Sequence, residues 1–294
     1  MKKIMITGAT GGLGSEVVRQ LKAKQPAANI SILVRNPENE TVKAFTSQGI
    51  NVQQGSYDDY QSLVQAFQGI EVLYFVSGND ILARAQQHEN VINAAKEAGV
   101  QHILYTSTVR KDESATAPLY PVVGTHVQTE NLIKASGMKF TLLRHNLYAE
   151  VVPLFLGAQV AETKTVYLPA GTGKTAFVAR TDFAAAAANI LSQPELHENK
   201  IYELNGAEQI SFEEIGTIIA TAIGAPVQYV SPDVNDYATT MKEAGLPEEV
   251  TAMLSMFGQA IANTEFDQQS DDLVQLLGRQ PQSVQTFIQQ AYSK

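Results

Sequence analysis

The first half of the chain alternates short apolar runs with longer segments whose apolar residues recur at helical spacing. Strands that are apolar nearly throughout and alternate with helices are typical of a parallel sheet covered on both faces. The predicted strands are Ile4–Ile6, Ile30–Val34, Gly49–Gln53, Glu71–Val76, Gln101–Thr106 and Lys139–Leu143. Helices are predicted after the first strand, around Val17 and Leu21, and then over Glu40–Ser47, Asp59–Gln68, Ile81–Ala98 and Thr125–Ala135. The pattern indicates an α/β fold with a doubly wound parallel sheet of the Rossmann type.

Beyond Arg144 the strands become sparse and helices dominate. Strands are predicted at Thr165–Leu168, Ile201–Leu204 and Val227–Val230, and helices at Thr181–Ser192, Ser211–Ile223, Val234–Ala244, Pro247–Ala262 and Asp271–Leu277. Thr181-Asp182 and Ser211-Phe-Glu-Glu214 have the residue types that cap helix N-termini. We expect a dinucleotide-binding domain over residues 1–150. A smaller, mixed substrate-binding part is expected over residues 151–294, and some of its segments can rejoin the main sheet.

Glycines mark the turn between the first strand and the first helix. Gly8, Gly11 and Gly14 stand in the segment Thr7-Gly-Ala-Thr-Gly-Gly-Leu-Gly14. In a dinucleotide-binding turn the first glycine permits the bend, the second lets the backbone approach a pyrophosphate, and the third lets the helix pack on the strand. The spacing is not Gly-x-Gly-x-x-Gly, but the strand before it and the helix after it supply the context that the motif needs. We therefore expect phosphates at the helix N-terminus, where free N–H groups favour negative charge.

The second strand ends at Arg35, about twenty residues after the last glycine of the turn. In this fold an acidic side chain at that place binds the ribose hydroxyls of NAD, whereas an arginine accommodates the 2′-phosphate of NADP. A planar guanidinium suits a phosphate. Arg35 thus favours NADP(H), with Glu38 nearby as the argument for NAD.

Composition narrows the functional classes. The formal charge of −9 argues against nucleic acid as the main partner. The absence of cysteine excludes disulfides, thiolate metal sites and a cysteine nucleophile. No signal peptide precedes the first strand, and the longest apolar run, Ala184–Leu191, is too short to span a bilayer. We expect a cytoplasmic protein without a metal site, and a homodimer remains open because an apolar helix face can be core or interface.

Taken together, these segments resemble the atypical short-chain dehydrogenases of the NmrA-like group, and within it the bacterial NADPH-dependent quinone oxidoreductases and triphenylmethane-dye reductases. The resemblance covers nearly the whole chain. It rests on the glycine turn and on the segments Leu33-Val-Arg-Asn-Pro37, Gly55-Ser-Tyr-Asp58, Phe75-Val-Ser-Gly78, Tyr105-Thr-Ser-Thr108, Leu143-Arg-His-Asn-Leu-Tyr148 and Ser270-Asp-Asp-Leu273.

The resemblance implies where the cofactor, NADP(H), is bound. The pyrophosphate would lie on Gly8, Thr10, Gly11, Gly12, Leu13 and Gly14, and the 2′-phosphate on Arg35. The adenine would lie by Tyr57 and Asp58. The nicotinamide side would be formed by residues at the ends of three later strands, namely Val76, Ser77, Gly78, Thr106, Ser107, Thr108, Asn146, Leu147 and Tyr148.

The Tyr-x-x-x-Lys pair of most short-chain dehydrogenases is absent. Tyr120 is followed four residues later by Gly124, and the register of extended relatives places Val122 and His126 at the tyrosine and lysine positions. Reducing a carbonyl needs a proton delivered to a localised oxyanion, whereas a quinone or a cationic dye delocalises the incoming charge. The missing pair therefore favours direct hydride transfer to a flat, electron-poor acceptor that is held close to the nicotinamide.

Two residues are candidates for catalysis. His126 would contact the nicotinamide ribose or donate a proton to a reduced quinone near neutral pH, or else be a structural histidine. Tyr148 would approach the nicotinamide. With Tyr148, the residues Val151, Val152, Phe155 and Leu156 either wall an apolar substrate pocket or pack in the core.

Three functions fit these observations. The first is an NADPH-dependent reductase of quinones or related small aromatic acceptors. The second is a non-catalytic NADP(H) sensor that signals through a partner protein. The third is a reductase of carbonyls or phenylpropanoid-like double bonds, against which the missing tyrosine and lysine count.

Overall fold

The computed structural model describes residues 1–157 and 160–292, and within them a seven-stranded sheet forms the centre of the molecule. Its strand order is β3-β2-β1-β4-β5-β6-β9, and every neighbouring pair is parallel. The strands are β1 (Ile4–Ile6), β2 (Ile30–Val34), β3 (Asn51–Gln54), β4 (Val72–Phe75), β5 (His102–Thr108), β6 (Lys139–His145) and β9 (Lys200–Leu204). The doubly wound parallel sheet predicted from the sequence is confirmed.

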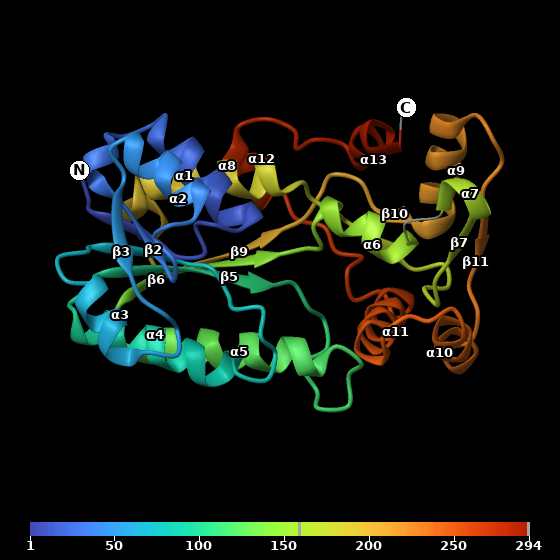
Figure 1. The fold of residues 1–294 in the computed structure, drawn as a ribbon, viewed down its shortest axis with the longest axis horizontal. Coiled ribbons are helices and arrows are strands. Elements are labelled where there is room, and N and C mark those ends of the chain that lie inside the picture. Colours follow the sequence, from blue (N-terminus) through green and yellow to red (C-terminus); the bar gives the residue numbers. More distant parts are fainter. Residues whose placement is uncertain (158–159, 293–294) are drawn as a thin grey trace.

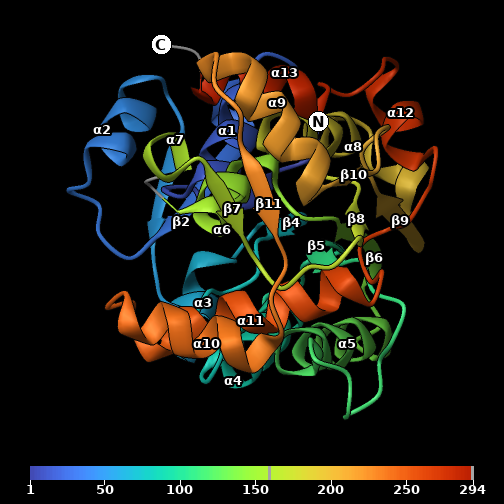
Figure 2. The same ribbon diagram turned by 90° about the vertical axis from the view of Figure 1, so that its right-hand side faces the viewer.

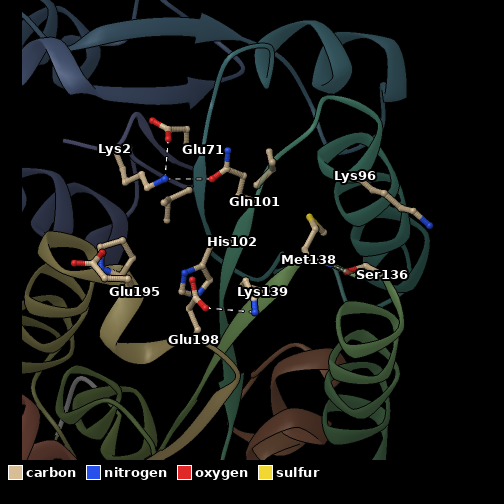
Figure 3. Close-up of a pocket in the computed structure, with 14 residues that line it drawn as sticks. Lys2, Glu71, Lys96, Gln101, His102, Ser136, Met138, Lys139, Glu195 and Glu198 are labelled. Atoms are coloured by element: carbon tan, nitrogen blue, oxygen red, sulfur yellow. Dashed lines mark hydrogen bonds and ion pairs between the residues drawn. The ribbon is translucent and has the colours of Figure 1, made fainter.

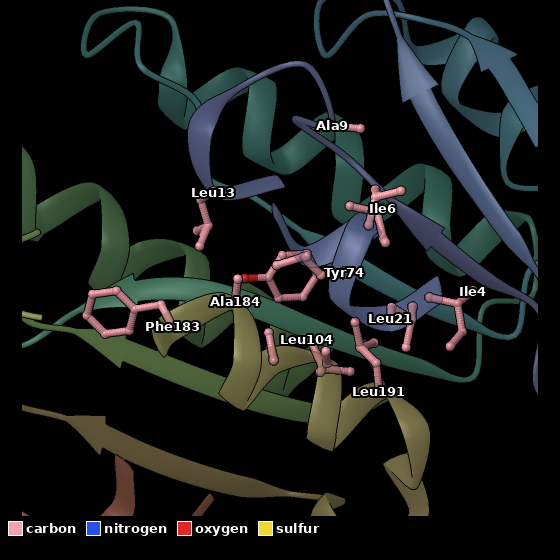
Figure 4. Packing of buried hydrophobic residues seen from close by; sticks show 14 of the residues in the cluster. Ile4, Ile6, Ala9, Leu13, Leu21, Tyr74, Leu104, Phe183, Ala184 and Leu191 are labelled. Carbon is pink, nitrogen blue, oxygen red and sulfur yellow. The ribbon is translucent and has the colours of Figure 1, made fainter. Parts of the chain in front are cut away.

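Helices cover both faces of the sheet (Figure 1). One face carries α1 (Gly12–Lys22), α2 (Glu40–Ser47), α8 (Arg180–Ser192) and α12 (Asp272–Leu277), and the other carries α3 (Tyr60–Ala66), α4 (Arg84–Glu97) and α5 (Tyr120–Ala135). On the first face, side chains of three adjacent strands pack against those of α1 and α8, as Figure 4 shows for Ile6, Tyr74, Leu104, Leu21 and Phe183. Burial of these apolar side chains is the main force that holds the layers together.

Segments from the second half of the chain return to this sheet. β9 pairs with β6, from Thr141 opposite Lys200 to His145 opposite Leu204. α8 packs on α1, and α12 packs on α8 and β9. Elements from beyond residue 150 therefore complete both the main sheet and the helix layer on one of its faces.

The remaining elements form a second core at one end of the sheet, which faces the viewer in Figure 2. Its helices are α6 (Val152–Leu156), α7 (Val160–Thr163), α9 (Phe212–Ile223), α10 (Val234–Glu243), α11 (Glu248–Ala262) and α13 (Val284–Tyr292). Two small sheets join them, one of β7 (Thr165–Tyr167) with β11 (Gln228–Val230) and one of β8 (Lys174–Thr175) with β10 (Ile210–Ser211). No helix in the described ranges has the length and apolar composition that a membrane span requires.

Two predicted helix starts need correction. α4 begins at Arg84, not at Ile81. α5 begins at Tyr120, not near Thr125, because Pro121 fits the first turn, where its missing N–H has no helical partner. Gly124 leaves room there for the ring of Tyr120, which would come within 3.1 Å of a Cβ at that position.

Of the two predicted helix caps, the structure contains one. Ser211 and Glu214 form the predicted capping box of α9. α8 has Ala179 as its N-cap without a side-chain bond, so Thr181-Asp182 does not cap it. Asp182 instead accepts hydrogen bonds from Arg279 Nη2 and the Gln282 amide, both at 2.6 Å.

A buried carboxylate joins four elements behind the sheet edge. Glu130 of α5 is 1% exposed and accepts hydrogen bonds from Arg110 (2.7 and 2.9 Å), from Arg144 (3.0 and 2.7 Å) and from Ser107 (2.6 Å). Arg144 also pairs with Glu203 of β9 at 2.8 Å. Burial raises the pKa of Glu130, but the bonds from Arg110 and Arg144 outweigh it and hold that pKa below its usual range.

We predict that Glu130→Gln destabilises the fold by about 3 kcal/mol, because Arg110 and Arg144 lose the buried carboxylate between them and keep only the more exposed Glu113 and Glu203 as partners. Glu113→Gln, which removes an exposed partner of the same Arg110, should cost less than about 1 kcal/mol. Urea unfolding at pH 7 measures both. Because the pKa of Glu130 is depressed, its contribution is present above the unfolded pKa of about 4.3 and is lost as pH falls through the folded pKa. Equal effects of the two substitutions would contradict this account.

Candidate cofactor and acceptor site

A cavity of about 640 Å³ lies at the carboxyl ends of β1, β2, β3 and β4. In a doubly wound sheet this edge is where ligands bind, at the point where the strand order reverses. The residues that line it come from the strand ends and two later segments: Gly8, Thr10, Gly11, Gly12, Leu13, Gly14, Leu33, Val34, Arg35, Gly55, Ser56, Tyr57, Asp58, Val76, Ser77, Gly78, Asn79, Asp80, Gln87, Tyr148 and Arg180.

The glycine turn brings the start of α1 to this cavity. Gly8 has a φ of +62°, and a Cβ on Gly14 would lie 2.3 Å from the Gly8 carbonyl oxygen. No side chain would fit between them, so α1 can begin directly against the end of β1. The N-cap of α1, Gly11, makes no side-chain hydrogen bond to the first amides of the helix. The helix thus presents N–H groups and the positive end of its dipole to the cavity, as an anion site requires.

Two arginines add positive charge along the cavity wall. Arg35 follows β2 and is exposed. Arg180, the first residue of α8, has its Cζ 4.8 Å from the centre of the Tyr148 ring, and its Cδ would lie 3.4 Å from a Cβ on Gly12. Sequence reasoning missed Arg180, although a cation in the first turn of a helix opposes the dipole and so suggests an anionic partner.

The loop after β3 is fixed by its neighbours. The Tyr57 hydroxyl bonds Thr7 and donates to the Val76 carbonyl at 2.8 Å. Asp58 accepts from Gln87 Nε2 at 2.9 Å. Burial raises the pKa of Tyr57 above its usual value, so this hydroxyl stays protonated and holds the ends of β1 and β4 together. Gln87, Asn79 and Asp80 had no signal in the sequence that distinguished them from ordinary polar residues.

His88 of α4 holds the loop after β4 from beneath. It is fully buried; its Nε2 accepts from the Gly78 amide at 3.0 Å, and its Nδ1 lies 2.9 Å from Thr129 Oγ1. Thr129 donates to the Thr125 carbonyl, so Nδ1 carries the proton and His88 is neutral. Burial, with Arg84 adding to it, lowers the pKa of His88 to about 3. The sequence could not predict the partners of this histidine, because they come from three different parts of the fold.

Several predicted site residues do not line the cavity. Thr106 supports it from behind, since its Oγ1 accepts from the Ser77 amide at 2.9 Å. Ser107 bonds Glu130, and Asn146 donates to Asn205 at 2.8 Å. Thr108 and Leu147 are partly exposed but are not among the residues that line the cavity.

His126 lies in a buried environment, which fits one of its three interpretations, the structural histidine. It is 5% exposed, and its Nδ1 lies 2.7 Å from the hydroxyl of Tyr105. Burial, with Arg84 and His88 nearby, lowers the pKa of His126 well below its ordinary value. A lowered pKa favours the neutral imidazole near pH 7, which suits a structural histidine better than a proton donor.

The apolar residues after Tyr148 divide between the two interpretations. Val152, Phe155 and Leu156 are buried in the second core, where Phe155 contacts Phe212 and Phe257. Tyr148 lines the cavity, and burial raises its pKa to about 12. His145 packs face to face with Phe183, with ring centres 4.0 Å apart. The packing role thus holds for most of this segment.

A second cavity, of about 530 Å³, lies at the opposite edge of the sheet (Figure 3). Its charged side chains pair among themselves, Lys2 with Glu71 at 2.9 Å and Lys139 with Glu198 at 3.5 Å. His102 is buried beside it and bonds Thr141 at 2.8 Å. Ligands of a doubly wound sheet bind at the carboxyl ends of its strands, so we do not place the dinucleotide at this amino-terminal edge. Among the described residues no group of His, Cys, Asp or Glu side chains is arranged to hold a metal ion.

Comparison with known proteins agrees with this geometry. The model of the NmrA-like family matches residues 1–288. Quinone oxidoreductase 2 of Escherichia coli (strain K12) is 40% identical over 86% of this chain and 85% of its own.

Solved structures give the same result. The NADPH-dependent quinone oxidoreductase of Escherichia coli, solved with NADPH, superposes with a TM-score of 0.89 at 35% identity, covering 99% of this chain and 100% of its own. The triphenylmethane reductase of Citrobacter sp., solved with NADP(H), has a TM-score of 0.89 at 33% identity over 98% of this chain and 99% of its own.

We predict that His88→Asn weakens NADPH binding about five- to tenfold, because the shorter amide cannot reach the Gly78 amide and one hydrogen bond worth about 1 kcal/mol is lost. His88→Gln reaches as far as Nε2, and its carbonyl oxygen can still accept, so it should bind NADPH nearly as wild type does. Fluorescence titration measures both affinities, and circular dichroism checks the fold. A glutamine variant as weak as the asparagine variant would refute the proposed role of this bond.

Proposed function

The chain belongs to the NmrA-like family, and from this premise we propose that it reduces quinones or similar flat, electron-poor acceptors with NADPH. The chain is an NADP(H)-dependent oxidoreductase, as its similarity to quinone oxidoreductase 2 supports. The observation that carries the choice of acceptor is an NADP(H) cavity in a chain whose α5 lacks the Tyr-x-x-x-Lys pair of carbonyl reductases.

The residues present fit NADP(H). The uncapped start of α1 and the glycine turn suit the pyrophosphate, with Arg180 across the turn as its counter-charge. Arg35 suits the 2′-phosphate, which distinguishes NADPH from NADH. Tyr57 and Asp58 are placed to border the adenine, and Gly78 and Tyr148 to border the nicotinamide end. When bound, NADPH supplies the hydride.

The chain's own residues contribute binding and orientation to this reaction. The glycine turn fixes the phosphates, the loop held by His88 fixes one wall, and Arg180 stacked on Tyr148 closes another. Neither His126, which is buried and neutral, nor Tyr148, whose pKa is about 12, readily gives up a proton at pH 7. An acceptor that delocalises charge needs no such donor in the transition state, and proximity then supplies much of the acceleration.

We assign acceptor binding to the second half of the chain, residues 151–294, and cofactor binding mainly to residues 1–150. The second core stands beside the carboxyl ends of β5 and β6, next to the nicotinamide side of the cavity (Figure 1). The second half also supplies Arg180 to the cofactor side. A cytoplasmic location and a small aromatic substrate fit this proposal.

The function is tested by NADPH oxidation with a panel of quinones and a cationic triphenylmethane dye. Turnover that requires no added flavin is expected. Tight NADPH binding without turnover of any acceptor would favour the sensor instead.

Arg35→Met should raise the KM for NADPH about ten- to a hundredfold while leaving the KM for NADH nearly unchanged, since a charge-assisted bond to the 2′-phosphate contributes about 1.5–3 kcal/mol. Arg19→Met, which removes an exposed arginine of α1 paired with Glu16, is the matched control. Steady-state kinetics with both cofactors decides. Parallel losses with NADPH and NADH would show that Arg35 does not read the phosphate.

A further inference from the structure

Arg84 is a buried cation without a counter-ion. Arg84 is 5% exposed. It forms no ion pair among residues 1–157 and 160–292. Its Nη2 donates to the Val122 carbonyl at 3.2 Å, and its buried Nε finds no hydrogen-bond partner in the same ranges. Buried charges are ordinarily paired, because removing them from water is costly. Arg84 therefore carries positive charge that the described chain does not neutralise.

Its position in the fold adds to that charge. Arg84 is the first residue of α4, where the helix dipole is already positive. The nearest acid in sequence, Asp80, uses its carboxylate to accept from the Leu82 and Ala83 amides, each at 3.1 Å, and does not pair with Arg84. The helix end and the guanidinium thus reinforce each other.

The groups around Arg84 are neutral and polar. His88, Tyr105 and His126 are buried beside it; burial, with Arg84 adding to it, keeps both imidazoles uncharged by lowering their pKa values. Arg84 lies behind the wall of the cofactor cavity, because its Cγ would come within 3.9 Å of a Cβ added at Gly78, which lines the cavity. It stands directly behind the loop that borders the proposed nicotinamide end.

Arg84 also reaches the part of α5 where the acid–base pair is missing. The register of α5 puts Val122 at the tyrosine position and His126 at the lysine position. Arg84 donates to the backbone carbonyl of Val122, and it adds to burial in lowering the pKa of His126. A cation from α4 therefore lies against the part of α5 that, by the resemblance to short-chain dehydrogenases, would carry the tyrosine and the lysine.

We propose that Arg84 replaces that lysine electrostatically, stabilising the negative charge that develops on an oxygen of the reduced acceptor. The inference rests on the proposed quinone reductase function. The quinone takes up a hydride, two electrons and one proton, from NADPH, which becomes NADP⁺. The resulting hydroquinone monoanion then gains its second proton from water. Arg84 stabilises the monoanion by its positive charge, and it donates no proton.

Arg84 should affect the reduction of neutral and of cationic acceptors differently. A neutral quinone becomes an anion on hydride uptake, so a nearby cation lowers its barrier. A cationic triphenylmethane dye becomes neutral, so the same cation gives it no help and opposes its binding. A structural arginine would affect both acceptors alike.

The test compares Arg84→Met and Arg84→Lys with wild type, and uses Arg19→Met as the charge-matched surface control. We expect Arg84→Met to lower kcat/KM for a neutral quinone about ten- to a hundredfold, and to leave or raise kcat/KM for the cationic dye. Arg84→Lys should keep the wild-type preference. Equal losses on both acceptors in the methionine variant, or loss of the preference in the lysine variant, would overturn the proposal.

A second readout needs no turnover. 4-Nitrophenol, a flat phenol whose anion is yellow, is titrated against the protein with NADP⁺ present. Wild type and Arg84→Lys should bind it with a lowered phenol pKa, and Arg84→Met should not. An unshifted phenol on wild type would refute the charge site. A shift without any quinone or dye turnover would instead refute the proposed function and leave the charge site standing.

Discussion

The close approach of Gly14 to the carbonyl of Gly8 is the constraint on which the site depends. With no side chain between them, α1 starts at the end of β1 and aims its first amides at the carboxyl edge of the sheet. The parallel order of the strands then brings the ends of β2, β3 and β4 to the same edge. Arg35, Tyr57 and Gly78 meet there, although long segments separate them in the chain.

The sequence predicted the sheet because its signals are local. The apolar runs, the glycine turn and Ser211 with Glu214 each act over a few residues. The same holds for the residues that end strands, since parallel strands must end at one edge. Thus the sequence alone places the glycines, Arg35 and Tyr57 at the edge where the cavity lies.

What the sequence could not show depends on contacts between distant segments. Asp182 was read as a cap, yet it binds Arg279 and Gln282 from the far end of the chain. The sequence leaves His126 as a ribose contact, a proton donor or a structural histidine, and its burial against Tyr105 becomes visible only in the fold. Arg180 and Arg84 had no distinguishing neighbours in sequence, because their significance comes from Gly12 and from Val122 across the fold.

The position of Arg180 links the stability of the protein to cofactor binding. It belongs to the second half of the chain but lies against Gly12 of the first. A phosphate bound at the turn would therefore be held by both halves, and each half would gain stability from the same ligand, growing with the logarithm of its concentration. Chains that lack cofactor would lose this added stability, unfold more often and be degraded sooner. The abundance of the protein would then follow the cell's supply of NADP(H), with no separate regulator involved.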